Sequence, residues 1–416
     1  MDRKLTTPKE VGFDAKRLAL IKPAMQAYVD QNKIAGIVTL LARQGKVVHF
    51  EQVGWQDREA QLPMKADTIF RIYSMTKPVI CTALMTLYER GLFRLTDPVA
   101  RFIPGFGSVK VLESDGAGGT KLVELRRPVT VRDLLTHTSG LTYHFLVDSP
   151  VSELYRQNVI MHDAGLSLQR FVEELVRLPL AYQPGTRFQY SLGIDVAAAL
   201  IEILAGMPLG QFLQERFFGP LGMLDTGFYV PPEKQARLAA MYGLPDIGLA
   251  TTHVISLWVA FQNGVNERLD VSKTNPSDQE SCARGGYGLF STAWDYLRFA
   301  QMLLQGGELD GMRFLSRKTL ELMHTNHLPA SLLPYEIGGM PAHGYGFGLG
   351  SRVLMNVAAA QIPGSIGEFG WGGAAKTYYW VDPVEELVGV FMCQAMMSFE
   401  VPDIDFRVLA YSALVD

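Results

Sequence analysis

The sequence contains 416 residues, of which 48% are hydrophobic and 19% are charged, and its formal net charge is −4. The hydrophobic fraction suffices for a packed core and excludes an intrinsically disordered chain. No run of five basic residues occurs, so a surface that neutralises many phosphates is missing and we expect no nucleic-acid partner.

The first elements that the sequence predicts are a helix and a β-hairpin. Asp14 precedes residues 15–31, whose apolar side chains recur at helical spacing, and we expect Pro23 to kink this helix. The segment Ile37–Trp55 that follows consists of two β-rich runs on either side of Gly45. Because glycine supports a tight turn, this pattern predicts an antiparallel hairpin.

The middle of the chain is mainly helical by its pattern of apolar residues. Proline and glycine separate the helical segments, and the polar stretch Asn263–Arg284 lacks periodicity, which favours a surface loop. The predicted helices are Thr76–Glu89, Val131–Thr136, Leu168–Leu178, Val196–Leu204 and Trp294–Leu304.

Strand-forming residues return at the end of the chain. The β-branched and aromatic runs Lys376–Val381 and Glu386–Cys393 precede an apolar helix over Asp403–Val415. We therefore predict an α/β (α+β) fold in which an antiparallel sheet is flanked by N- and C-terminal helices. Residues 1–90 and 285–416 would form this domain, residues 91–284 an inserted, mainly helical region, and the active site would lie between the two.

The three cysteines, Cys81, Cys282 and Cys393, are too far apart for a disulfide framework or a zinc knuckle, and free thiols are typical of a reducing compartment. The first residues lack the apolar core of a secretory signal, and apolar runs such as Ile34–Ala42 are too short to span a bilayer. We expect a cytoplasmic protein that binds neither a metal nor a membrane.

The sharpest chemical signal is the segment Ser74-Met75-Thr76-Lys77, at the junction of an extended lead-in and a predicted helix. The spacing puts Lys77 one helical turn after Ser74, on the same face. A serine hydroxyl is a weak nucleophile until a base takes its proton, and an amine can be that base where burial disfavours its charge. A helix cap followed by a surface lysine has the same spacing, but the strand-to-helix junction favours the catalytic interpretation.

Two further segments contain candidate residues. Tyr190 ends the turn and extended segment Pro184–Ser191, and a tyrosine beside an ammonium can pass a proton between a serine and a leaving group. A core tyrosine gives the same pattern. Gly370–Ala374 opens a predicted strand that continues through Lys376–Val381, and its glycines allow close approach of a ligand, although packing or a bulge also explains them.

Taken in order, Ser74–Lys77, Tyr190 and Trp371–Gly373 resemble the serine β-lactamase-like superfamily, the group of class C β-lactamases, DD-peptidases and family VIII carboxylesterases. The resemblance covers about residues 10–415. Three further stretches support it, namely Leu134–Leu141, Pro184–Ser191 and Gly286–Ala293.

The resemblance implies a role for each matching residue. Ser74 would be the acylated nucleophile, and Lys77 and Tyr190 would share the role of general base. The backbone N–H groups of Ser74 and Ala374 would form the oxyanion hole. His137, in the stretch that supports the resemblance, looks structural in the family, as does Ser139.

Two departures from the lactamase pattern bear on the substrate. Leu192 stands where an asparagine is usual and cannot hydrogen-bond a substrate amide, and Trp371-Gly372-Gly373 replaces the usual Lys-Thr-Gly. Without that lysine the site lacks an ammonium for a substrate carboxylate, and Trp-Gly-Gly looks like the family VIII esterases. We expect Leu192, Trp371, Gly372 and Gly373 to contact a neutral ester, and we interpret Lys376-Thr377 as strand rather than as a displaced motif.

Other hydrolase types are not supported. No serine lies in a Gly-x-Ser-x-Gly elbow and no HExxH motif occurs. We therefore predict a cofactor-free serine carboxylesterase that hydrolyses short to medium acyl esters through an acyl-enzyme on Ser74, with a small ester as its only expected partner. Acyl transfer and β-lactam or D-peptide hydrolysis stay open as alternatives, as does a sensor that is acylated without turnover. The sequence does not indicate an oligomeric state.

Overall fold

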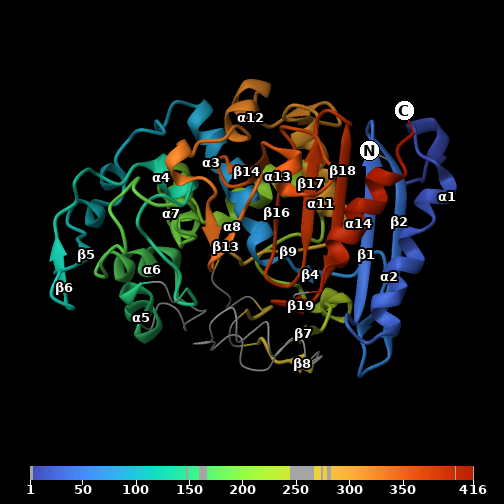
Figure 1. Cartoon of the computed structure of the whole chain (residues 1–416), viewed down its shortest axis with the longest axis horizontal. Coiled ribbons are helices and arrows are strands. Elements are labelled where there is room, and N and C mark those ends of the chain that lie inside the picture. The colour runs from blue at the N-terminus through green and yellow to red at the C-terminus, as the bar shows by residue number, and fades with distance from the viewer. Residues whose placement is uncertain are drawn as a thin grey trace.

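The β-rich runs near both ends of the chain pair into a single sheet. The computed structural model describes residues 3–146, 149–158, 166–243, 267–272, 275–278, 283–398 and 400–415. Its main sheet is antiparallel throughout and has eight strands in the order β14-β15-β16-β17-β18-β1-β2-β3 (Figure 1). The strands are β1 Gly36–Arg43, β2 Lys46–Asp57, β3 Leu62–Pro63, β14 Tyr345–Phe347, β15 Arg352–Leu354, β16 Phe369–Gly372, β17 Tyr378–Asp382 and β18 Leu387–Cys393.

The predicted antiparallel sheet and its terminal helices are confirmed. The β1–β2 hairpin turns at Gln44 and Gly45, which both have positive φ angles, of 52° and 74°. On one face of the sheet lie α2 (Ile21–Asp30) and α14 (Pro402–Ser412), and on the other lies α11 (Ala293–Leu304). Because helices cover both faces, β1 is buried at every residue.

The N-terminal helix differs from the prediction. Instead of one kinked helix there are two, α1 (Ala15–Leu18) and α2, separated at Ala19 and Leu20. Asp14 caps the first, since its side chain accepts a hydrogen bond from the Arg17 N–H at 2.8 Å. Pro23 lies in the first turn of α2, where the missing N–H would have had no intrahelical partner, so it starts a helix rather than bending one.

Helices dominate the middle of the chain, as predicted. The domain boundaries at residues 90 and 285 stay a prediction. The helices of this part are α3 Thr76–Glu89, α4 Val131–Leu135, α5 Pro150–Gln157, α6 Leu168–Leu175, α7 Gly193–Ala205, α8 Leu209–Leu213 and α9 Gly219–Leu221. Two short helices, α12 Arg317–Met323 and α13 Val357–Ala360, follow α11.

Small strand pairs lie outside the main sheet. The polar stretch Asn263–Arg284 was expected to be a loop, but Glu267–Leu269 forms strand β8, which pairs with β7 (Met241–Gly243). Residues 263–266, 273–274 and 279–282, Cys282 among them, lie outside the described residues. The other short strands are β4 Phe70–Arg71, β5 Val111–Ser114, β6 Thr120–Val123, β9 Phe290–Ser291, β10 Glu308–Leu309, β11 Met312–Arg313, β12 Glu336–Ile337, β13 Met340–Pro341 and β19 Ala395–Met396.

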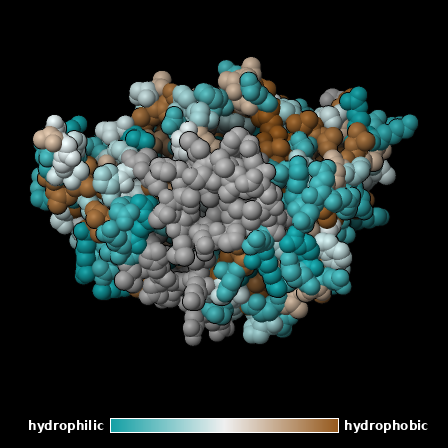
Figure 2. All heavy atoms as spheres, turned by 60° about the horizontal axis from the view of Figure 1, so that its bottom comes forward, coloured by the Kyte–Doolittle hydropathy of each residue, from teal (hydrophilic) through white to brown (hydrophobic). Residues whose placement is uncertain are grey.

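The described surface is mixed in character. On the face shown in Figure 2, hydrophobic side chains occur in groups among hydrophilic ones, as on most globular proteins. Within the described ranges, no single helix is both long enough and apolar enough to cross a membrane. The cytoplasmic location expected from the sequence stays a prediction.

The start of α4 is held by a buried carboxylate, Asp133. Its oxygens accept hydrogen bonds from the Thr130 N–H at 2.8 Å, from Arg127 at 2.6 and 2.9 Å, and from the Thr138 hydroxyl at 3.1 Å. Although burial opposes ionisation, the hydrogen bonds from Arg127 and Thr130 hold the pKa of Asp133 below its ordinary value. The carboxylate thereby joins α4 to the segment that includes His137.

We expect Asp133→Asn to lower the free energy of unfolding at pH 7 by about 1–3 kcal/mol, because charge-assisted hydrogen bonds are lost. A carboxyl group with a depressed pKa stabilises the fold above its unfolded pKa, and this contribution disappears as the pH falls through its folded pKa. Urea denaturation measures the free energy of unfolding of both proteins. The wild type should exceed the variant by the full amount at pH 7, and this difference should shrink below about pH 4. Asp30→Asn, at an exposed carboxylate, is the control. A difference that persists unchanged in acid would contradict this account.

Candidate active site

Ser74 lies at the bend between β4 and α3. A short 3-10 turn, Tyr73–Met75, joins the strand to the helix, and Tyr73 adopts a positive φ of 42°. Such a conformation is uncommon for a residue with a side chain, and here it redirects the chain sharply. The turn leaves the Ser74 side chain half-buried at the beginning of α3. This position, at the junction of a strand and a helix, is the one predicted from the sequence.

Lys77 lies in the first turn of α3 and is only 1% exposed. Its Nζ lies 3.2 Å from the Ser74 Oγ and donates a hydrogen bond to the Gly286 carbonyl oxygen at 2.7 Å. The same nitrogen faces two aromatic rings, with 4.6 Å to the Tyr190 centroid and 5.2 Å to the Tyr143 centroid. Two electron-rich ring faces and a carbonyl oxygen thus surround an amine that solvent hardly reaches.

Tyr190 reaches the same serine from the loop before α7. Its hydroxyl lies 2.8 Å from the Ser74 Oγ. The Trp371 indole N–H donates a long hydrogen bond of 3.4 Å to the Tyr190 oxygen, and the two rings lie 5.8 Å apart. The structure thus brings Ser74, Lys77, Tyr190 and Trp371 into one hydrogen-bonded group.

The strand predicted across Gly370–Val381 is in fact a hairpin. β16 ends at Gly372, the chain turns, and β17 begins at Tyr378. Lys376 and Thr377 therefore lie before β17, and Lys376 has a left-handed φ of 65°. The glycine-rich run contains too few side chains to show where one strand stops and the next one starts.

The turn after β16 lies against the backbone just before Ser74. A Cβ at Gly373 would collide with the Ile72 carbonyl oxygen and the Thr377 hydroxyl, so this position has room only for glycine. A Cβ at Gly372 would make ordinary contacts. Ala374 is fixed by its carbonyl oxygen, which accepts from the Met397 N–H at 2.6 Å. Its participation in an oxyanion hole stays a prediction.

Leu192 is not part of the hydrogen-bonded group. It precedes α7, is buried in the main hydrophobic core, and its N–H donates to the Thr142 carbonyl oxygen at 3.3 Å. Contact between Leu192 and a substrate stays a prediction.

Sequence reasoning missed three groups around Lys77. The Gly286 carbonyl holds its amine, and the Gly286 N–H donates to the buried Asp195 carboxylate at 3.0 Å. Burial raises the pKa of Asp195, and the Lys77 charge opposes this shift. A Cβ on Gly286 would lie 2.5 Å from an Asp195 oxygen and 2.7 Å from the Tyr143 hydroxyl. The stretch Gly286–Ala293 supported the family resemblance, but the role of a backbone carbonyl leaves no trace in side-chain identity.

His137 packs behind Tyr190 with its ring centroid 4.7 Å from that of the tyrosine. Its Nδ1 lies 3.1 Å from the Ser191 Oγ. Burial, together with the Lys77 charge, lowers the pKa of His137 well below its ordinary value, so the imidazole is neutral at physiological pH. A neutral, buried ring fits the structural role that was expected for His137. Ser139 is also buried, and its hydroxyl accepts from the Leu141 N–H at 3.3 Å.

Metal and thiol chemistry find little support in the described part of the chain. There, no group of three histidine, cysteine or acidic side chains is placed to hold a metal ion. Cys81 and Cys393 are buried, free thiols whose pKa values are raised by burial.

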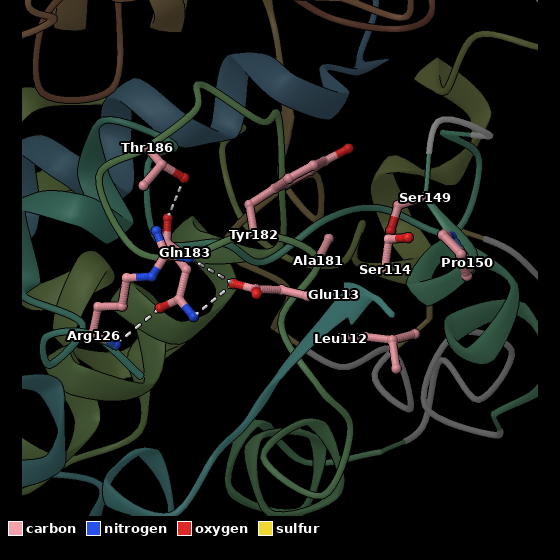
Figure 3. Close-up of a pocket in the computed structure, with 10 residues that line it drawn as sticks. All are labelled: Leu112, Glu113, Ser114, Arg126, Ser149, Pro150, Ala181, Tyr182, Gln183 and Thr186. Atoms are coloured by element: carbon pink, nitrogen blue, oxygen red, sulfur yellow. Dashed lines mark hydrogen bonds and ion pairs between the residues drawn. The ribbon is translucent and has the colours of Figure 1, made fainter. Parts of the chain in front are cut away.

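A separate hollow of about 380 Å³ lies beside β5, and none of Ser74, Lys77, Tyr190 and Trp371 lines it (Figure 3). Its polar side chains bind one another: Gln183 donates to Glu113 at 3.0 Å and accepts from the Arg126 N–H at 2.9 Å. The hollow is therefore separate from the hydrogen-bonded group around Ser74.

Comparisons with known proteins identify the family of the chain. A family model described as Beta-lactamase matches residues 21–412. An uncharacterised protein of Mycobacterium tuberculosis is 36% identical over 371 residues, which cover 88% of this chain and 87% of that protein. Esterase EstB of Burkholderia gladioli is 29% identical over 391 residues, 90% of each chain.

Among solved structures, EstCE1, described as a hydrolase with promiscuous acyltransferase activity, superposes with a TM-score of 0.77 at 28% identity, over 95% of this chain and 99% of that one. The sequence-based resemblance and the fold class are confirmed. The chain therefore belongs to the beta-lactamase family of serine hydrolases and acyltransferases.

Proposed function

We propose that this protein is a serine carboxylesterase that hydrolyses short to medium acyl esters through an acyl-enzyme on Ser74. The observation that carries the proposal is that the Ser74 Oγ lies 2.8 Å from the Tyr190 hydroxyl and 3.2 Å from the Lys77 amine. Both distances allow direct proton transfer. The similarity to Esterase EstB over 90% of each chain supports an ester as the substrate.

In the proposed acylation step, the pair starts with one proton removed, as a Tyr190 phenolate beside the Lys77 ammonium, so that it can act as a base. The Ser74 Oγ attacks the ester carbonyl carbon while its proton passes to the Tyr190 oxygen. The carbonyl oxygen becomes an oxyanion, to which the N–H groups of Ser74 and Ala374 would donate. The bond between the carbonyl carbon and the alcohol oxygen then breaks. The alcohol oxygen accepts, from the Tyr190–Lys77 pair, the proton that came from Ser74. The products are a free alcohol and an acyl group esterified to Ser74.

Deacylation repeats these events with water. The water oxygen attacks the acyl carbon while the Tyr190–Lys77 pair accepts a proton from the water. The pair then passes this proton to the Ser74 oxygen as the bond between that oxygen and the acyl carbon breaks. The carboxylic acid departs and the serine is regenerated. No cofactor enters either step.

The surroundings of the pair suit this cycle. The Lys77 amine is held by the Gly286 carbonyl and lies against the Tyr190 ring, so the charge of the protonated amine stabilises a negative tyrosine oxygen before that oxygen accepts the proton. The Trp371 indole donates to that oxygen as well. The indole N–H and the amine over the ring thus both act on the side chain that we propose to move the proton.

The neutral indole of Trp371 supports an uncharged substrate, because a carboxylate there would lack an ionic partner. We expect Trp371→Lys to raise the ratio of kcat/KM for mono-p-nitrophenyl succinate over p-nitrophenyl butyrate by about 5- to 10-fold, less at high salt. Trp371→Met removes the indole without adding charge and is the control. Equal ratios for the lysine and methionine variants would mean that residue 371 does not face the substrate.

Product release over time tests the proposal against its alternatives. An esterase releases p-nitrophenol at a steady rate, whereas an acylated sensor stops after one equivalent per chain. Acyl transfer is the second candidate, because EstCE1 is a hydrolase with promiscuous acyltransferase activity, and it would give a new ester when a small alcohol is added. β-Lactam or D-peptide hydrolysis is a further proposal, and the neutral Trp371 argues for a lower rate with these anionic substrates.

A further inference from the structure

Two aromatic side chains form a stacked pair beside the proposed catalytic group. The ring centroids of Tyr143 and Phe145 lie 4.7 Å apart with an interplanar angle of 19°, and we name this pair the Tyr143–Phe145 stack. Tyr143 is 3% exposed, whereas Phe145 is 39% exposed. The tyrosine is therefore the inner ring and the phenylalanine the outer, solvent-accessible one.

The inner ring borders the proton-transferring side of the site. The Tyr143 centroid lies 5.2 Å from the Lys77 Nζ and 5.3 Å from the Tyr190 centroid. Ala374, the proposed oxyanion partner, packs instead in a separate cluster with Tyr73 and Met397. The stack thus lies next to Lys77 and Tyr190, the proposed general base, rather than next to Ala374 and the proposed oxyanion hole.

The chemistry of acylation links this position to one part of the substrate. In the proposed function, on which this inference rests, the Ser74 Oγ bonds to the acyl carbon and the bond to the alcohol oxygen breaks. That oxygen must then take a proton from the Tyr190–Lys77 pair, so it has to lie next to the pair. The group attached to the alcohol oxygen consequently leaves the catalytic centre on the side of Tyr143.

We propose that the Tyr143–Phe145 stack binds the alcohol part of the substrate, and that esters of aromatic alcohols are a preferred substrate class. Tyr190, Tyr143 and Phe145 form a series of adjacent rings that ends in an exposed one. A flat ring on the alcohol extends the series by stacking on Phe145, which a saturated ring of the same size cannot do equally well.

Benzyl acetate and cyclohexylmethyl acetate test this inference, since both deliver the same acyl group and their alcohols contain a six-membered ring that is flat in the first and puckered in the second. The wild-type enzyme should have a higher kcat/KM for the benzyl ester. Phe145→Leu keeps an apolar side chain but removes the ring, and should reduce the benzyl-to-cyclohexylmethyl ratio by about 3- to 10-fold, the usual size of a stacking effect. The kcat/KM for cyclohexylmethyl acetate should fall less than that for benzyl acetate, because the saturated ring loses apolar contact but no ring stacking.

Trp55→Leu is the matched control, because Trp55 is 38% exposed but belongs to β2 near the edge of the main sheet. This variant should keep the wild-type ratio. If both esters are hydrolysed and Phe145→Leu leaves the ratio unchanged, the alcohol-binding assignment is wrong while the proposed function stands. If the wild type hydrolyses neither ester, the proposed function fails and takes the assignment with it.

Discussion

Ser74→Ala is expected to abolish ester hydrolysis, with a loss in kcat of at least about 10⁴-fold, because no acyl-enzyme can form without the hydroxyl. Hydrolysis of p-nitrophenyl butyrate measures the rate. Intact-mass analysis after treatment with a fluorophosphonate probe, followed by peptide mapping, measures the covalent adduct. We expect one adduct per wild-type chain, on Ser74, and none on the variant.

Ser191→Ala is a suitable control for this experiment. Ser191 is also buried and follows directly on Tyr190, but its hydroxyl contacts His137 and the Gly193 N–H, not Ser74. The variant should keep its activity within about tenfold and should still be labelled on Ser74. A probe adduct on any other residue of the wild type would overturn the assignment of the nucleophile.

Lys77→Ala and Tyr190→Phe should each lower kcat by about 10²–10⁴-fold while the probe-reactive serine is still present. The first change removes the amine 3.2 Å from the Ser74 Oγ, and the second removes the hydroxyl 2.8 Å from it. Steady-state kinetics across pH 6–9 provide the measurement. The loss should appear mainly in kcat and not in KM, because these groups take part in proton transfer during the chemical step and not in substrate binding.

The Tyr28 hydroxyl offers a matched comparison, since it donates to Asp405 at 2.7 Å between α2 and α14. Tyr28→Phe should leave the esterase rate within about twofold. Full activity of Tyr190→Phe at neutral pH would show that the tyrosine does not shuttle the proton, even if Ser74 is the nucleophile.

Local sequence patterns were enough to predict most elements that position the site. The α3 helix spans Thr76–Glu89 as predicted, because its apolar spacing and the following Gly91, with a φ of 71°, mark both ends. The β1–β2 hairpin likewise follows from Gly45. These features depend on residues close in sequence, for which periodicity and turn chemistry are informative.

Other features depend on tertiary contacts that no local pattern reveals. The turn between β16 and β17 occurs where Gly373 meets the Ile72 carbonyl, a contact between distant segments. The Gly286 carbonyl lies 209 residues from Lys77 in sequence, and a backbone acceptor is the same in every residue type. The resemblance to a known superfamily pointed to Tyr190 and Trp371, but the environment of the lysine required coordinates.

The pairing of β1 with β18 has a consequence for synthesis on the ribosome. Ile37 lies opposite Cys393, so the sheet stays open until the last strand has emerged from the exit tunnel. Such distant pairings close late, since the entropy of a very long loop must be overcome first. The turn that lies against the backbone before Ser74 belongs to the same half of the sheet, so we expect the hydrogen-bonded group around Ser74 to assemble only after residues up to Cys393 have been synthesised.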